Sequence, residues 1–166
     1  MSNPGQPTIK NGDTGDAVKR AQRALNRAPD LPGFTVLEVD GSFGPLTEGR
    51  VREFQQLVKS LMVDGIVGPH TWAALPSGGA MPVLREGSTG GVVYDLQRTL
   101  NGIIPNALAQ DGIYGPLTKA KVVQFQQITS TSPQDGIVGE RTWKAKAGLL
   151  SRPTLEHLVG LQYAIC

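Results

Sequence analysis

Apolar residues recur three or four positions apart in several segments of this 166-residue chain, a spacing that predicts short amphipathic helices. The stripes of the first helix in each half are Val18, Ala21 and Leu25, and Val93, Leu96 and Leu100. Asp16 is placed to cap the first of these helices, and Asn26 and Asn101 are placed to help end the two.

Three more segments have helical spacing. They are a second helix carrying Val51, Phe54 and Val58 (Val122 and Phe125 in the other half), a short third helix carrying Trp72, Ala73 and Leu75 (Trp143, Ala145 and Leu149), and a C-terminal helix of about three turns carrying Leu155, Leu158, Val159 and Leu161. The chain is therefore predicted to be mainly α.

An octet, Asp-Gly-x-x-Gly-x-x-Thr, precedes the second and third helices and occurs four times, at residues 40–47, 64–71, 111–118 and 135–142. Its Asp-Gly pair predicts a turn, because the Asp side chain can bond nearby amides and Gly accepts positive φ. The second Gly is expected to allow a tight bend or a close backbone contact, and Thr to cap the helix that follows. Structural roles are therefore assigned to Asp40, Gly44, Thr47, Asp64, Gly68, Thr71, Trp72, Asp111, Gly115, Thr118, Asp135, Gly139, Thr142 and Trp143.

The octets reveal a duplication. Residues 40–72 and 111–143 are identical at 17 of 33 positions, at an offset of 71, whereas the upstream helices align at an offset of 75. The four extra residues of the first half fall near Pro29 to Val39. We expect an N-terminal tail (1–7), a first repeat (8–76), a linker made flexible by Gly pairs (77–81), a second repeat (82–150) and a helical tail (151–166).

Composition and charge exclude several classes of protein. Sixteen basic residues face 14 acidic ones, too even a balance for a nucleic-acid-binding surface. No segment approaches the ~20 apolar residues needed to span a membrane. The N-terminus lacks the pattern of a secretory signal, and the single cysteine, Cys166, excludes an intrachain disulfide.

No catalytic constellation stands out. His70 and His157 are far apart and lack the spacing of zinc ligands, and the Asp-Gly turns lack the preceding acids of a calcium loop. Four Asp residues in identical turns fit a structural role better than a glycosidase pair. We expect no metal, no cofactor and no enzymatic activity.

Each repeat resembles the peptidoglycan-binding domain family of three-helix modules. The resemblance rests on the helix ending in Gln-x-x-Leu-Asn, the paired octets, the Phe-Gln between them and the Thr-Trp that closes the second octet, in both repeats. It implies two tandem three-helix modules and a role in holding a partner, usually a wall hydrolase, on bacterial peptidoglycan. From this sequence we expect a departure from that pattern, with no fused catalytic domain.

The resemblance leads us to expect non-catalytic binding of the glycan strand or stem peptide, at the cell wall or outside the cell, with delivery on a phage or particle as an alternative. Candidate ligand residues are Phe43, Arg50, Gln55, Gln56, Tyr114, Lys121, Gln126 and Gln127. Phe43 and Tyr114 could instead complete the core, and Trp72 and Trp143 are expected as core anchors. Two rival functions are a structural protein of a secreted, phage or injection-system assembly, with the C-terminal helix contacting a protein partner, and a hydrolase with a cryptic site.

Overall fold

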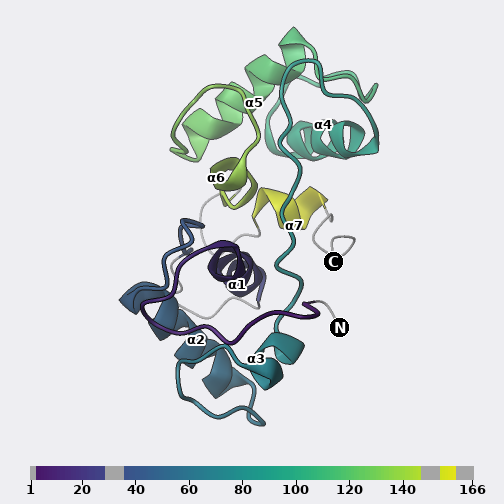
Figure 1. Cartoon of the computed structure of the whole chain (residues 1–166). Helices are drawn as coiled ribbons and strands as arrows, with labels where there is room; N and C mark the ends of the chain where they lie inside the picture. Colours follow the sequence, from purple (N-terminus) through teal and green to yellow (C-terminus); the bar gives the residue numbers. More distant parts are fainter. Residues whose placement is uncertain (1–2, 29–35, 147–153, 160–166) are drawn as a thin grey trace. The chain divides into compact units, whose positions relative to one another are not determined.

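A computed structural model describes residues 3–28, 36–146 and 154–159. Over these residues the chain contains α-helices and isolated β-bridges and no β-strand, so the mainly α prediction is confirmed (Figure 1). The helices are α1 (Asp16–Arg27), α2 (Pro45–Leu57), α3 (Pro69–Ala74), α4 (Gly91–Ile103), α5 (Pro116–Ile128), α6 (Glu140–Trp143) and α7 (Leu155–Val159). Chain contacts divide between Ala80 and Met81 into two compact units, called the first and the second module below.

The first module buries the apolar stripes of α1 and α2 against each other, with α3 closing the core. Its fully buried side chains include Val18, Leu25 and Val51, and Trp72 is buried beside them. Burial of one such side chain contributes about 1.5–3 kcal/mol. Two isolated antiparallel bridges, Ile9 with Val67 and Thr14 with Ser42, hold the irregular segments over this core.

The second module repeats this arrangement with α4, α5 and α6. Its bridges, Leu84 with Val138 and Thr89 with Ile113, lie at the positions that the duplication predicts. The buried side chains of its helices include Val93, Leu96, Leu100, Val122, Phe125 and Trp143. Two copies of one sequence pattern have therefore built two copies of one core.

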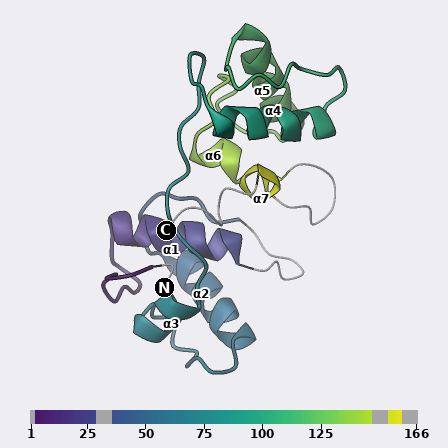
Figure 2. The ribbon, with the colours of Figure 1, turned by 90° about the vertical axis from the view of Figure 1, so that its right-hand side faces the viewer.

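The described part of the C-terminal helix is α7, with five residues, and the rest of the predicted helix, including Leu161, lies outside the described residues. α7 packs against α4 and α6, and Figure 2 shows it (yellow) next to both. Leu155 and Val159 are buried there, and the Leu155 amide donates to the Ala145 carbonyl. These two apolar side chains serve the second module itself, so the structure gives no support to a partner contact through them.

The helix starts differ from the prediction. The N-cap positions are Gly15, Gly44, Gly68, Gly115 and Gly139, and none has a side-chain cap hydrogen bond. Asp16 is the first residue of α1, where its negative charge interacts favourably with the positive end of the helix dipole. The four octet threonines lie inside the first turns and bond a side chain described below, so their predicted role as caps is wrong.

The first glycine of each octet behaves as predicted and the second does not. Gly41, Gly65, Gly112 and Gly136 all have φ between 72° and 77°. The second glycine has an ordinary extended backbone, with φ of −103° at Gly44, and a Cβ added there would meet nothing within 4 Å. No close contact therefore requires glycine at that second position.

The linker, predicted to be flexible, is packed, and Asn3 of the N-terminal tail takes part in holding it. The Asn3 side chain is buried, donates to the Pro76 carbonyl at 2.9 Å and accepts from the Gly78 amide at 3.0 Å. Arg27 donates to the Ser77 and Gly79 carbonyls. A Cβ on Gly78 would lie 2.0 Å from the Arg20 carbonyl oxygen, so this glycine permits a backbone approach that no other residue allows.

Candidate functional site

A glutamine side chain holds each octet in place. Gln22 on α1 places its Nε2 atom 2.8 Å from Asp40 Oδ1 and 3.1 Å from the Ser42 carbonyl, with Thr47 Oγ1 at 3.3 Å. Its Oε1 atom accepts from the Gly41 amide at 3.0 Å. A buried amide with all its bonds made fixes the turn to the helix, because breaking the set leaves several polar groups without partners.

The other three octets use the same arrangement, which we call the glutamine clamp. Gln55 holds the second octet, Gln97 the third and Gln126 the fourth, each reaching its octet's Asp, a carbonyl, Thr and the Gly amide. All four glutamines are at most 1% exposed. Sequence reasoning did not predict the role of Gln22 and Gln97. It placed Gln55 and Gln126 in the ligand site, whereas in the structure their side chains are buried in the interior.

Phe43 and Tyr114 also lie in the interior, at equivalent positions of the two modules. The Tyr114 hydroxyl donates to the Gly136 carbonyl, and burial raises the pKa of this phenol well above its ordinary value. The two residues therefore complete the cores, as the alternative in the sequence analysis held. Trp72 and Trp143 are core anchors as expected, and their indole N–H groups donate to the carbonyls of Pro7 and Pro82.

The remaining candidates fall into two pairs. Arg50 and Lys121 are buried at equivalent positions of α2 and α5. Arg50 donates to the Leu25 carbonyl at 3.3 Å, and Lys121 donates to Asn101 Oδ1 at 2.9 Å, while burial lowers the pKa of Lys121. Gln56 and Gln127 are exposed, each next to a clamp glutamine.

Two asparagines fix the chain segments that return from α1 and α4. Asn26 exchanges two hydrogen bonds with the backbone of Leu37, and Asn101 does the same with Leu108. Both lie inside their helices rather than ending them. Their partners lie 11 and 7 residues further along the chain, so the four extra residues of the first half fall between Asn26 and Leu37.

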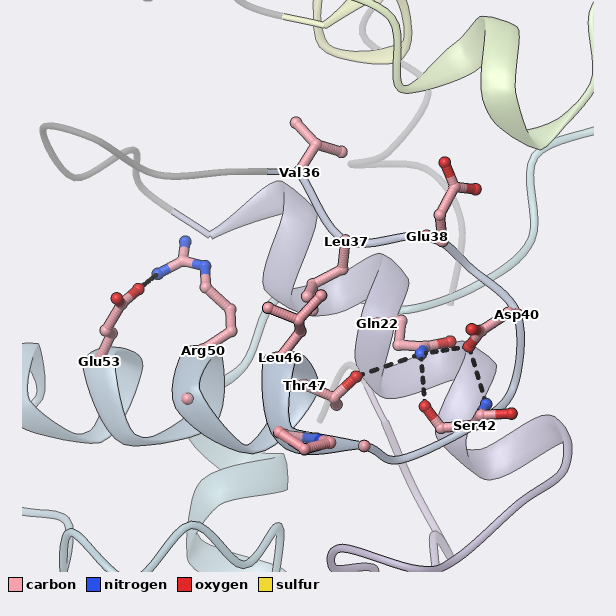
Figure 3. A pocket seen from close by; sticks show the side chains of 13 residues that line it. Gln22, Val36, Leu37, Glu38, Asp40, Ser42, Leu46, Thr47, Arg50 and Glu53 are labelled. Atoms are coloured by element: carbon pink, nitrogen blue, oxygen red, sulfur yellow. Dashed lines mark hydrogen bonds and ion pairs between the residues drawn. The ribbon is translucent and has the colours of Figure 1, made fainter. Parts of the chain in front are cut away.

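A pocket of about 500 Å³ opens between the start of α2 and the segment that Asn26 fixes. Figure 3 shows Leu46, Arg50 and Glu53 along α2, opposite Val36, Leu37 and Glu38. The clamp of the first octet, with Gln22, Asp40 and Thr47, forms one end of it. Of the predicted ligand residues, the pocket brings in Arg50, and it does not include Phe43, Gln55 or Gln56.

Leu46 is one of the pocket residues that sequence reasoning missed, together with Glu38 and Glu53. It is 82% exposed, and its counterpart Leu117 in the second module is 75% exposed. The available signal was its position: it follows Gly-Pro at the start of a helix, outside the stripe formed by Val51 and Phe54. A large apolar side chain left in solvent by both modules is a natural wall for a ligand.

The described residues contain no cluster of three His, Cys, Asp or Glu side chains that could hold a metal ion. Nor does any helix in the described part of the chain have the length and hydropathy to cross a membrane. The lining of the pocket can recognise a ligand through its shape, through apolar contacts and through charge.

A family model described as "Putative peptidoglycan binding domain" matches residues 14–75 and 89–145, one match for each module. The chain belongs to this family. Both matches include the paired octets and the glutamine clamps. The predicted tandem organisation of peptidoglycan-binding domains is thus confirmed.

Two curated relatives match part of the chain. An uncharacterized protein in the bpoA1 3'region of Kitasatospora aureofaciens is 43% identical over 81 residues, which cover 47% of this chain and 65% of that protein. The zinc D-Ala-D-Ala carboxypeptidase of Streptomyces albus G is 39% identical over 66 residues, 39% of this chain and 24% of that enzyme. The chain therefore spans just under two thirds of the first relative and about a quarter of the second.

Two solved structures are also similar. A peptidoglycan-binding protein from Clostridioides difficile, in complex with glutamine hydroxamate, is 38% identical, with 42% of this chain and 40% of that chain covered and a TM-score of 0.35. The Burkholderia AP3 phage endolysin is 27% identical, with 72% and 38% covered and a TM-score of 0.37. These TM-scores are too low to establish a common arrangement of whole chains.

Proposed function

We propose that this protein binds bacterial peptidoglycan without cleaving it, and that the pocket beside α2 is a contact site for the wall. The observation that carries the proposal is the family match to both modules. The pocket supports it, because its volume suits part of a glycan or a short peptide and its exposed Leu46 offers an apolar wall.

Two modules on one chain suit a polymeric ligand. Once one module is bound, the second meets the wall at a high local concentration, which raises avidity without any new contact. The exposed Leu117 places an equivalent apolar side chain on the second module. We further propose that the protein acts at the cell wall and localises a partner there. The similar carboxypeptidase and endolysin are both longer than the part that matches this chain, and both are named for enzymes.

Sedimentation with purified insoluble peptidoglycan tests the proposal. We expect the full chain to move into the pellet at low salt. Leu46→Ser should weaken binding by about threefold to fivefold, since burying roughly half of a leucine side chain on a ligand is worth about 1 kcal/mol. Met62→Ser is the matched control, because Met62 is 77% exposed but does not line the pocket. Protein that stays wholly in the supernatant would reject wall binding.

The absence of catalysis needs its own measurement. Purified protein incubated with a suspension of cell walls should leave the turbidity unchanged and release no soluble fragments. Clearing by the pure protein, at a rate that grows with its concentration, would replace this proposal with a wall hydrolase.

A further inference from the structure

The pocket of the first module is acidic. Among its lining residues, Glu38, Asp40 and Glu53 carry carboxylates, and Arg50 carries the one positive charge. Figure 3 shows Glu38 and Glu53 on either side of the apolar wall formed by Leu37 and Leu46. A ligand seated on that wall would thus have a carboxylate on each side.

The positive charge lies at one end of the pocket and is directed to groups of the module. Arg50 is 3% exposed, with its guanidinium 3.5 Å from Glu53 and 3.3 Å from the Leu25 carbonyl. Figure 3 shows Glu38 at the other end, on the same segment as Asp40, with its carboxylate directed away from that of Asp40. Asp40 already accepts from Gln22 and from the Ser42 amide, so its carboxylate is fixed in direction by the clamp.

The second module has the same fold without two of the three acids: Asp111 and Lys121 correspond to Asp40 and Arg50, but Glu38 and Glu53 have no acidic counterpart. At the offset of 71 residues, Ala109 replaces Glu38, Gln124 replaces Glu53 and Ile113 replaces Ser42. Ala109, Gln124 and Ile113 are all exposed, so none of these changes is required by core packing. Selection for folding alone does not account for acids at these positions in one module, because the other module folds with Ala and Gln there.

We propose that the first-module pocket binds a protonated primary amine carried next to a short apolar segment, and that the second module does not share this preference. The inference rests on the proposed function. In the wall this chemistry has two sources, a free amino group of an uncrosslinked stem peptide and the amine of a de-acetylated glycan sugar. Each exposed carboxylate would then contribute a screened ion pair to the ammonium group.

The test uses the full chain and four probes in calorimetry or chemical-shift titration: disaccharide-peptide fragments with a free side-chain amine, the same fragments N-acetylated, glucosamine oligomers, and N-acetylglucosamine oligomers. We expect amine-bearing probes to bind about tenfold more tightly than their acetylated partners, with shifts at Glu38 and Leu46 and a loss of the preference in high salt. Whether the peptide or the sugar shows this ratio identifies the source.

The decisive variant, E38A/E53Q, gives the first module the residues of the second. It should bring the amine-to-acetyl ratio close to one and leave sedimentation with whole peptidoglycan reduced but present. The control, E86Q/D95N, removes two acids from exposed ion pairs outside the pocket and should keep the ratio. E38A alone should lower the amine-to-acetyl affinity ratio in part. Because E38A leaves the ion pair between Arg50 and Glu53 intact, it separates the loss of an acid from a disturbance of Arg50.

Two results separate the failures. If the wild-type protein binds peptidoglycan but treats amine and acetylated probes alike, the inference is wrong and the proposed function stands. If it binds neither the wall nor any fragment, the proposed function falls and the inference with it.

Discussion

The two modules are alike inside and unlike at the pocket. Each holds its two octets with glutamine clamps. The Gln, Asp, Gly and Thr of each clamp, eight residues in a module, occupy the same relative positions in both modules. At the pocket, by contrast, Glu38 and Glu53 are replaced by Ala109 and Gln124. The comparison teaches that the repeated pattern specifies the fold, while the residues beside it can differ without changing the fold.

The interiors also differ, and two of the differences involve polar groups. Tyr114 in the second module has a hydroxyl bonded to the Gly136 carbonyl, where the first module has Phe43. Lys121 takes the place of Arg50 and bonds Asn101, the residue that fixes the returning segment. In the second module the Tyr114 hydroxyl and the Lys121 ammonium both have hydrogen-bond partners, which offsets the cost of desolvation.

The largest expected effect comes from breaking a clamp. Gln55→Ala and Gln126→Ala should each lower the free energy of unfolding of their own module by about 3 kcal/mol, because each removes the hydrogen bonds to a carbonyl, a glycine amide and a threonine hydroxyl inside the module, together with one to a carboxylate. Amide hydrogen exchange in the full chain, followed separately for α1 to α3 and α4 to α6, measures this.

Adjacent glutamines supply the control. Gln56→Ala and Gln127→Ala change exposed side chains and should stay within about 0.5 kcal/mol of wild type. Equal losses for the two clamp variants would support the equivalence of the modules. A loss at Gln126 that is less than half the loss at Gln55 would break it.

The two glycines of one octet should respond differently. Gly41→Ala forces positive φ on a residue with a Cβ that would lie 3.1 Å from Lys19 Cε, and it should cost about 1–2 kcal/mol. Gly44→Ala should change stability by less than about 0.5 kcal/mol, since its backbone is extended and the space is open. Urea denaturation checks both.

The same pair exists in the second module. Gly112 has φ of 72° and Gly115 has φ of −98°, so Gly112→Ala and Gly115→Ala should repeat the contrast. A cost above about 1 kcal/mol at Gly44 or Gly115 would mean that the second glycine has a structural role that the geometry does not reveal.

Tyr114→Phe should make the second module resemble the first at this position. It removes the hydroxyl bonded to the Gly136 carbonyl and should destabilise the second module alone, by about 1 kcal/mol. Tyr94→Phe, at a 42% exposed position of α4, is the control and should be neutral. Urea denaturation with a probe in each module measures the difference. A neutral Tyr114→Phe would show that the two cores tolerate the exchange without cost.

The sequence predicted the helices and the duplication because apolar spacing and turn residues are local signals. It failed to distinguish Gln55 from Gln56 because residue type alone does not tell which is buried. A local signal was nevertheless present: each clamp glutamine follows a buried valine by four residues, as Gln55 follows Val51, and so lies on the same helix face.

The pocket was beyond prediction for a different reason. It forms where the segment at Val36 to Glu38 comes back over the first turn of α2, and that return depends on the two hydrogen bonds between Asn26 and Leu37. Such a contact between distant residues leaves no periodicity in the sequence. Arg50 was found because it lies next to the octet, and Leu46 was missed because an exposed leucine has no signal without the surface around it.

The smallest expected effect concerns acid. Asp64 and Asp111, one in each module, have pKa values lowered first of all by a backbone amide, that of Ile66 or Ile113, and further by a clamp glutamine. A carboxyl whose pKa is lower in the folded state stabilises the protein at pH values above its unfolded pKa of ~3.9, and this contribution is lost as the pH falls through the folded pKa.

Asp64→Asn and Asp111→Asn keep an acceptor oxygen but remove the titration. Each variant should therefore lose less stability than wild type between about pH 5 and pH 2 in urea denaturation, and by a similar amount in the two modules, because the cause is the same. A variant that keeps the full acid sensitivity of wild type would place the titrating groups elsewhere. A difference confined to one module would mean that the clamps, although alike in geometry, hold their carboxylates with unequal strength.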